Sequence, residues 1–221
     1  MLQMRSVLAA GVLLSSSLGV AFVAPPCAAQ IVVNEILGDP GVDWDGNGAV
    51  SARDDEWVEI YNASGVPQVL DNYRLSDGGT TRLLRFGFTG TLAPGARKLV
   101  YGSTSVAWEA ANGVSATGLS LNNAGDTVRL WQIAATDTVL VDSYTYTTFE
   151  VLNDRSVGRF PDGGNEWRLF DHRAPYTGTL PPLGTGCEPT PGSPNQCPTA
   201  VEPAPWSRIK QIYRGPGADS H

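Results

Sequence analysis

The residues of this sequence best suited to chemistry lie in one acidic stretch, DWDGNGAVSARDDE, at positions 43–56. Counted from Asp43, oxygen-bearing side chains fall at positions 1, 3, 5, 9 and 12, with a glycine at position 6. This spacing is the register of an EF-hand calcium loop, here ended by aspartate as in dockerin-type loops. The predicted calcium ligands are Asp43, Asp45, Asn47, Ala49, Ser51 and Asp54, with Ala49 supplying its backbone carbonyl.

Each position of this loop has a physical reason. Alternate residues direct side-chain oxygens inward, Gly48 permits the sharp turn, and Val50 is expected to pack against the core. Calcium suits the site because it accepts six to eight oxygen ligands in flexible geometry, whereas magnesium requires a strict octahedron. We expect the ion to be structural, because it would neutralise the loop and fix the junction between two strands.

Two alternatives stay open for this loop. It leads directly into a strand-like run and no helix precedes it, so Asp55 or Glu56 could replace Asp54 as the closing ligand. Aspartate, asparagine and glycine are also common in ordinary solvated turns that hold no metal.

Candidates for catalysis are few. Of the two histidines one is the last residue, so a catalytic triad would depend on His172, which we interpret as a surface loop residue. Glu35 and Glu59 could form an acid and base pair of the glycosidase type. We interpret them instead as strand carboxylates paired with an arginine such as Arg74 or Arg129. The sequence therefore predicts a protein that is not an enzyme.

Tryptophans are the remaining candidates for ligand contact. Trp44, Trp108 and Trp131 fall in or near loops and strand ends, where they could stack on a sugar ring or anchor a protein partner. Core packing is the better explanation for Trp57 and Trp167.

Short β-type runs position these residues. From Ile31 onward, runs such as IVVNEIL, EWVEIYN and DTVRLWQI alternate with turn sequences such as DGG, LAPG and NNAGD. Many short strands at this spacing predict an all-β fold, an antiparallel β-sandwich of two sheets. The net charge of −7 argues against a nucleic-acid partner, because such binding relies on lysine and arginine.

The first 29 residues have the layout of a secretory signal peptide, with Arg5, an apolar stretch over 7–23 and small residues before Gln30. A retained membrane anchor is the alternative, because the apolar stretch is near the length that spans a bilayer. Cleavage after Ala29 would give a secreted, periplasmic or cell-surface protein that is not an integral membrane protein. In such a compartment Cys187 and Cys197 are expected to form a disulfide.

The rest of the chain divides at a change of composition. Residues 30–197 are expected to form the β-sandwich domain, whose last loop the disulfide holds. Residues 198–221 form a proline-containing linker and a short basic tail, in which Trp206, Ile209 and Tyr213 fall near one face of a helix.

Several motifs, taken in order, carry a family resemblance. They are NEI at 34–36, EWVEIYN at 56–62, LDNYRLSD at 70–77, LAPG at 92–95, LNNAGDTVRL at 121–130, SVGRFPDG at 156–163 and TPGSPN at 190–195. In this order they resemble the lamin tail domain family, an immunoglobulin-like β-sandwich found in nuclear lamins and in exported bacterial proteins. The resemblance covers about residues 31–195 and implies a bacterial binding or adhesion module without enzymatic activity. It implies no filament role, because the sequence has no heptads like those that precede the domain in nuclear members.

Together these observations predict a non-catalytic exported calcium-binding module for protein or cell-surface interaction. The alternatives are a carbohydrate-binding module, and an accessory domain of, or acting with, an extracellular hydrolase such as a nuclease.

Overall fold

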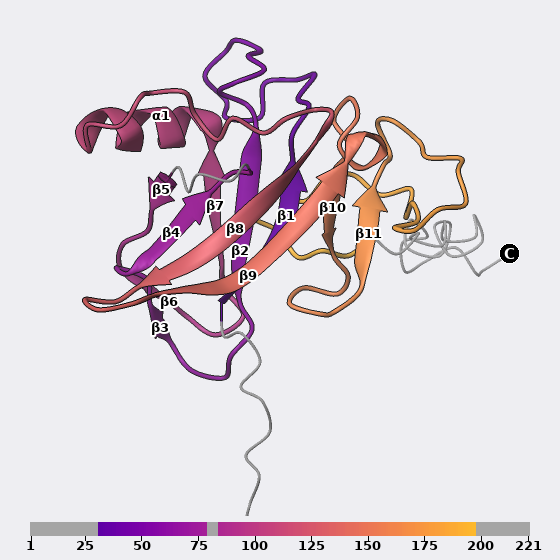
Figure 1. Cartoon of the computed structure of the whole chain (residues 1–221). Helices are drawn as coiled ribbons and strands as arrows, with labels where there is room; N and C mark the ends of the chain where they lie inside the picture. Colours follow the sequence, from indigo (N-terminus) through magenta and orange to yellow (C-terminus); the bar gives the residue numbers. More distant parts are fainter. Residues whose placement is uncertain (1–30, 79–83, 198–221) are drawn as a thin grey trace, which may run out of the picture.

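Two antiparallel sheets packed against each other form the body of the protein (Figure 1). The computed structural model describes residues 31–78 and 84–197, so the predicted signal peptide and C-terminal tail lie outside the described residues. The first sheet has the strand order β11-β10-β1-β2-β7, the second has the order β5-β4-β8-β9, and β3 and β6 form a small ribbon. The predicted all-β, immunoglobulin-like sandwich is confirmed.

The strands are short, as the turn-rich sequence predicts. Their bounds are β1 (Ile31–Leu37), β2 (Trp57–Asn62), β3 (Gln68–Val69), β4 (Tyr73–Ser76), β5 (Leu84–Gly87), β6 (Thr91–Leu92), β7 (Arg97–Tyr101), β8 (Gly125–Ile133), β9 (Thr138–Thr147), β10 (Ser156–Arg159) and β11 (Trp167–Phe170). A helix, α1 (Gly102–Ala111), follows β7, and a 3₁₀ turn, η1 (Thr148–Glu150), follows β9.

The central strands β1 and β2 are buried on both faces. On the inner face Val33, Val58 and Ile60 belong to the hydrophobic core shared with the second sheet. On the outer face Glu35 and Glu59 are also completely buried. Since a sheet face that holds carboxylates needs a polar cover, the chain must supply one from another segment.

The second sheet faces the core with one side only. Along β8, Val128 and Leu130 are buried, whereas Arg129 between them is half-buried, which is the alternation of a strand with one packed face. Leu75 and Tyr146 contribute to the core from β4 and β9. Truncating a core side chain of this size typically costs about 2–5 kcal/mol.

A polar contact joins the two sheets at a bulge in β1. The register of β1 against β2 shifts between Val33 and Glu35. The Val33 N–H donates to Asp142 Oδ2 of β9 (2.8 Å), and Arg159 of β10 forms an ion pair with the same carboxylate (2.9 Å). Asp142 therefore fastens β9 to both β1 and β10.

Helix α1 lies against β5 and the loop between β1 and β2 (Figure 1). The Trp108 ring packs on Phe86, with ring centroids 6.2 Å apart. At the helix start, a Cβ atom added to Gly102 would lie 1.8 Å from the Arg53 carbonyl oxygen. Only glycine permits this approach between helix and loop.

Among residues 31–78 and 84–197, no helix has the length and apolar character needed to cross a bilayer.

Candidate functional site

The loop between β1 and β2 brings three carboxylates together. One oxygen from each of Asp43, Asp45 and Asp55 lies within 4.8 Å of the other two. We call these three residues the acidic cluster; Asp43 and Asp45 are half-buried and Asp55 is buried. The loop projects from the same end of the sandwich as α1 (Figure 1). Clustered carboxylate oxygens are the ligands that a hard divalent cation prefers.

Backbone N–H groups hold the Asp43 carboxylate in place. It accepts hydrogen bonds from Gly46 (2.8 Å), Asn47 (3.1 Å) and Gly48 (2.8 Å). Gly46 and Gly48 have φ angles of +73° and +92°, a left-handed conformation that favours glycine. The predicted sharp turn at Gly48 is therefore present.

The Asp55 carboxylate ties the two ends of the loop together. It accepts hydrogen bonds from the backbone N–H groups of Trp44 (2.7 Å), Asp45 (3.0 Å) and Ser51 (2.7 Å). These three donors fix the position of the buried Asp55 carboxylate between the two ends of the loop.

Two further predicted ligands contact other parts of the loop. The Asn47 side chain donates to Asp45 (3.0 Å) and accepts from the Ala49 N–H (2.9 Å). The Ser51 hydroxyl accepts from the Asp54 N–H (3.1 Å). The Ser103 hydroxyl, which donates to Asp45, is the main reason that the pKa of Asp45 lies below its usual value.

Asp54, Asp55 and Glu56, the three residues that the sequence offers as the last ligand of the calcium loop, have different partners in the structure. Asp55 joins the acidic cluster. Asp54 instead forms an ion pair with Arg53 (2.7 Å), which lowers the pKa of Asp54. Glu56 turns away and accepts from the Leu121 N–H (3.1 Å), and burial raises its pKa to about 8.

Val50 does not pack against the core as expected. Its side chain is 59% exposed, because the tip of the loop, from Gly46 to Val50, stands away from the sandwich. The loop is anchored instead through Trp44, whose indole Nε1 donates to Asp154 Oδ1 (2.8 Å) and whose ring meets Trp57 edge-on at 6.1 Å.

The other predicted ligand-contacting tryptophans also have partners within the chain. Trp108 packs on Phe86, and Trp131 Nε1 donates to the Ser76 hydroxyl (2.8 Å). Trp57 is fully buried, as predicted, whereas Trp167 is only partly buried.

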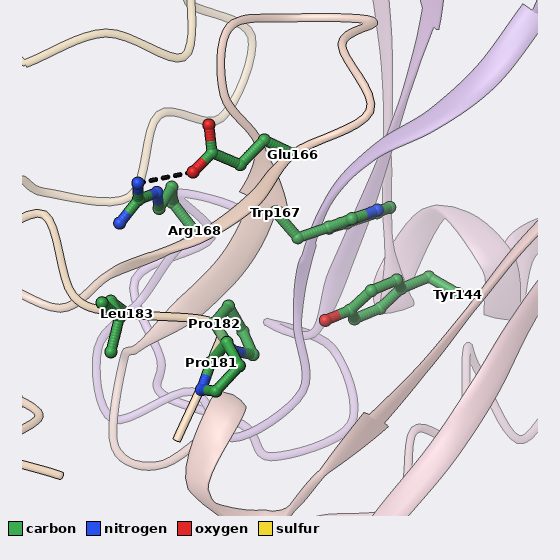
Figure 2. Close-up of a pocket in the computed structure, with 7 residues that line it drawn as sticks. All are labelled: Tyr144, Glu166, Trp167, Arg168, Pro181, Pro182 and Leu183. Carbon is green, nitrogen blue, oxygen red and sulfur yellow. Dashed lines mark ion pairs between the residues drawn. The ribbon is translucent and has the colours of Figure 1, made fainter. Parts of the chain in front are cut away.

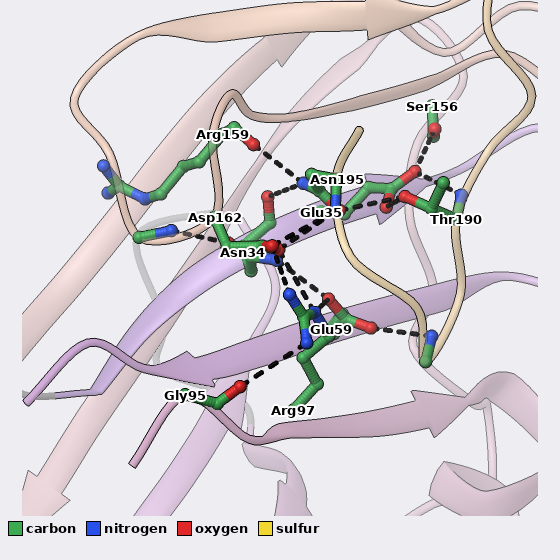
Figure 3. Close-up of polar contacts among 12 residues, drawn as sticks. Asn34, Glu35, Glu59, Gly95, Arg97, Ser156, Arg159, Asp162, Thr190 and Asn195 are labelled. Carbon is green, nitrogen blue, oxygen red and sulfur yellow. Dashed lines mark hydrogen bonds and ion pairs between the residues drawn. The ribbon is translucent and has the colours of Figure 1, made fainter. Parts of the chain in front are cut away.

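A second polar site lies on the outer face of the first sheet (Figure 3). Glu35 and Glu59 are directly paired across β1 and β2, and both are completely buried. Asn34 Nδ2 donates to Glu59 Oε1 (2.8 Å), and Arg97 Nε lies 3.8 Å from the same oxygen. Arg97 also forms an ion pair with Asp162.

The predicted arginine partners of these glutamates are wrong. Arg74 donates to the carbonyl oxygens of Asp71 and Tyr73 in its own strand region. Arg129 lies near the Asp77 carbonyl oxygen (3.4 Å) on the other sheet. Arg97 is the partner because β7, not β4 or β8, pairs with β2.

The residues from Cys187 to Cys197 cover this site, and we call them the closing segment. A disulfide joins its ends, as the sequence predicted, with the Cα atoms 5.4 Å apart. Thr190 donates to Glu35 through its N–H (3.1 Å), and Gly192 N–H donates to Glu59 Oε2 (2.7 Å). Asn195 N–H donates to Asp162 (3.2 Å).

Burial dominates the electrostatics of the pair. It raises the pKa of Glu35 to about 7 and the pKa of Glu59 to about 8, against the opposing effect of the surrounding hydrogen-bond donors. The closing segment seals both carboxylates, so a substrate cannot reach them as the structure stands.

His172 is exposed, as predicted for a surface loop residue. Its ring lies 3.2 Å from the Gly186 carbonyl oxygen and 3.8 Å from Glu188.

An open groove of about 390 Å³ lies between β9 and β11 (Figure 2). Trp167 and Tyr144 stack on each other along it, with ring centroids 3.7 Å apart. An ion pair between Glu166 and Arg168 lies at its side (2.5 Å). The groove is lined by Tyr144, Glu166, Trp167, Arg168, Pro181, Pro182 and Leu183.

The fold and the two polar sites define an immunoglobulin-like β-sandwich with a disulfide-closed cover over one sheet. A scan against protein families matches the Lamin Tail Domain over residues 25–148. The chain therefore belongs to the lamin tail domain family, a family of non-enzymatic immunoglobulin-like domains. A comparison with curated protein sequences gives no significant match.

The folded unit continues beyond the matched residues. β10 pairs with β1, β11 pairs with β10, and the closing segment covers both glutamates. Sequence reasoning missed Asn34, Asp142, Asp162 and Asn195 as members of these polar sites. The only available signal was the polar pair Asn34-Glu35 inside an otherwise apolar strand.

Proposed function

We propose that this protein is an exported, non-catalytic module for interaction with a protein or cell-surface partner, and that a structural calcium ion supports its β1–β2 loop. The observation that carries the calcium proposal is the convergence of Asp43, Asp45 and Asp55. Three carboxylates so close repel one another, and a divalent cation removes this repulsion.

The hydrogen bonds of the loop fit this role. The N–H groups that donate to Asp43 and Asp55 fix the direction of each carboxylate before any ion binds. A carboxylate has about four lone-pair positions, so three donors leave room for a metal. The Asn47 oxygen, backbone carbonyls and water supply the remaining ligands that calcium needs.

Export is supported by the predicted signal peptide over residues 1–29 and by the disulfide, since disulfides form in oxidising compartments. The absence of catalysis is supported by the burial of Glu35 and Glu59 beneath the closing segment.

The test is calcium titration of the purified protein by calorimetry, with thermal melts in calcium and in EDTA. We expect a dissociation constant between micromolar and millimolar. Calcium at one hundred times that constant should stabilise the fold by about 2.7 kcal/mol. This raises Tm by about 5–10 °C for a domain of this size. No binding heat together with coincident melts would refute the calcium proposal.

Matched variants locate the site. Asp45→Asn removes one charge from the acidic cluster and should weaken calcium binding at least about tenfold. Asp54→Asn is the control, because Asp54 contacts Arg53 outside the cluster and its loss should leave the affinity nearly unchanged. A strong effect of Asp54→Asn alone would support the EF-hand register in place of the cluster.

A carbohydrate ligand is a second candidate, and the groove between β9 and β11 is the observation that favours it. The groove offers the rings of Tyr144 and Trp167 as an apolar surface for a sugar ring, and the Glu166–Arg168 ion pair as partners for its hydroxyl groups. A glycan array with the wild type and a Trp167→Ala variant tests this function, with Trp108→Ala as the control. Binding that is equal in all three proteins, or absent in all, would remove the groove as a glycan site.

A further inference from the structure

The Thr190 hydroxyl of the closing segment lies between two oxygen atoms. Its Oγ1 is 2.7 Å from Glu35 Oε2 and 2.9 Å from Asn195 Oδ1. A hydroxyl has one hydrogen and can donate to only one of these oxygens. The other contact must therefore be made by a hydrogen that belongs to its partner.

The orientation of the Asn195 amide shows which partner this is. Asn195 Nδ2 lies 2.8 Å from the Arg159 carbonyl oxygen and 3.4 Å from the Asn34 carbonyl oxygen, and it donates to both. The opposite orientation would place two carbonyl oxygens against the amide oxygen. Asn195 Oδ1 thus faces Thr190 as an acceptor without a hydrogen of its own.

The remaining hydrogen must come from Glu35. Thr190 donates to Asn195 Oδ1, and a protonated Glu35 donates from Oε2 to Thr190 Oγ1. The other oxygen, Oε1, then accepts from the Ser156 hydroxyl (2.5 Å) and from the Thr190 N–H (3.1 Å). Neutral Glu35 completes every hydrogen bond in this relay.

The charges around Glu35 also favour its neutral form. Glu59 on β2 and Asp162 after β10 are carboxylates, and they share the single guanidinium of Arg97 on β7. Asn34 and Gly192 donate hydrogen bonds to Glu59, yet burial raises the pKa of Glu59 to about 8, so neither glutamate of the pair favours its charged form.

The other charged groups nearby have partners of their own. Arg159 on β10 forms an ion pair with Asp142 on β9. Within the closing segment the only titratable side chain outside the disulfide is Glu188, which pairs with Arg173 and lies 3.8 Å from His172. None of these groups offers a spare cation to an ionised Glu35.

We propose that the closing segment is a proton-dependent latch, held on the sheet by the relay from Glu35 through Thr190 to Asn195 and released when Glu35 loses its proton. The disulfide keeps the two ends of the released segment together, so the latch opens as a loop. Opening exposes Glu59 and the outer face of β1 and β2 to solvent. This inference is independent of the calcium proposal.

The direction of the pH dependence follows from proton linkage. Burial raises the pKa of Glu35 to about 7 in the closed state, from a value of 4.5 for a solvated glutamate. Opening between these pH values releases a proton. The same opening exposes Glu59, whose pKa burial raises to about 8, so Glu59 releases a second proton. The open population should therefore rise by between about tenfold and a hundredfold per pH unit from about pH 5 to about pH 7, and the contribution of Glu35, a factor of about ten per unit, should level off above that range.

Amide hydrogen exchange of the full protein with its disulfide intact tests the latch. The reporters are the N–H groups of Thr190 and Gly192, because both donate to the buried glutamates. Their protection factors, referred to the exchange rates of an unstructured peptide at each pH, should fall at least about tenfold per unit between pH 5 and 7. Constant protection across this range would overturn the proposal.

The Glu35→Gln variant keeps the shape of a neutral Glu35 side chain but removes its titratable proton. A glutamine amide can donate to Thr190 Oγ1 from the position of Oε2 and accept at the position of Oε1. We expect the protection factors of this variant at pH 5 to match those of the wild type. Their fall with pH should be smaller than in the wild type by a factor of about ten per pH unit, because one proton fewer is released on opening. Thr190→Val breaks the relay and should lower protection at every pH. Equal loss of protection in both variants at pH 5 would overturn the proposal.

Glu166→Gln is the matched control, since Glu166 is exposed and pairs with Arg168 outside the relay. It should keep the wild-type pH dependence. A carbon-detected NMR titration of the wild type gives a readout that needs no variant. A Glu35 carboxyl that titrates near pH 7 supports the latch, and one that titrates below pH 5 refutes it.

Discussion

Replacing Cys187 and Cys197 by serine should destabilise the protein mainly through its unfolded state. The disulfide closes a loop over a sequence separation of ten residues. In the chain-entropy model a loop of this length restricts the unfolded chain by about 3 kcal/mol. The hydrogen bonds from Thr190, Gly192 and Asn195 to the sheet remain possible in the folded variant, so the folded state should change little.

Denaturant unfolding at pH 6 is the assay. A chain of this size has a urea slope of about 2 kcal/mol per molar, so 3 kcal/mol corresponds to a midpoint about 1.5 M lower. The same loss lowers Tm by about 6–12 °C. Reduction of the wild-type protein is the matched control and should give the same midpoint as the double serine variant.

Two outcomes would refute this reasoning. An unchanged midpoint with intact amide protection at Thr190 would show that the disulfide restricts the unfolded chain little. An unchanged midpoint with lost protection at Thr190 would show instead that the disulfide acts on the folded state, by holding the closing segment in place.

The contacts between elements give two further predictions. Asp142→Asn removes the charge that joins β9 to Arg159 and should lower the free energy of unfolding, measured in urea, by about 1–3 kcal/mol. An unchanged midpoint would mean that this ion pair does not hold the sheets together. Gly102→Ala places a Cβ against the Arg53 carbonyl oxygen and should lower the free energy of unfolding by at least about 2 kcal/mol. In the control Gly65→Ala the new Cβ meets no atom within 4 Å, and the loss should be less than about 0.5 kcal/mol. Equal melting curves for the two alanine variants would contradict the close approach of α1 to the loop.

Much of the fold could be predicted from the sequence because its signals are local. Apolar runs such as IVVNEIL, separated by glycine, proline and asparagine, mark the strands, and the order of motifs marks the family. The pairing of Cys187 with Cys197 was also accessible, since residues 30–197 contain no other cysteine.

The sites could be predicted only in part, because their geometry depends on distant residues. Counting positions gave Asp54 as a ligand, but the side chain that turns into the cluster is Asp55, where the chain enters β2. The arginine beside Glu59 depends on which strand pairs with β2. The contact between Asn34 and Asn195 joins residues 161 positions apart, and no local pattern reports it.

The position of β1 in the middle of its sheet has a consequence for the order of folding. β1 is the first strand of the described residues, yet one of its two neighbours is β10, and Glu35 contacts a residue 121 positions later. The first sheet cannot be completed until nearly the whole domain has been synthesised, and such long-range pairing is slow. Such late completion is compatible with the export proposed above, because a chain that has not completed its sheet can still cross a membrane unfolded. The disulfide between Cys187 and Cys197 would then form after the crossing.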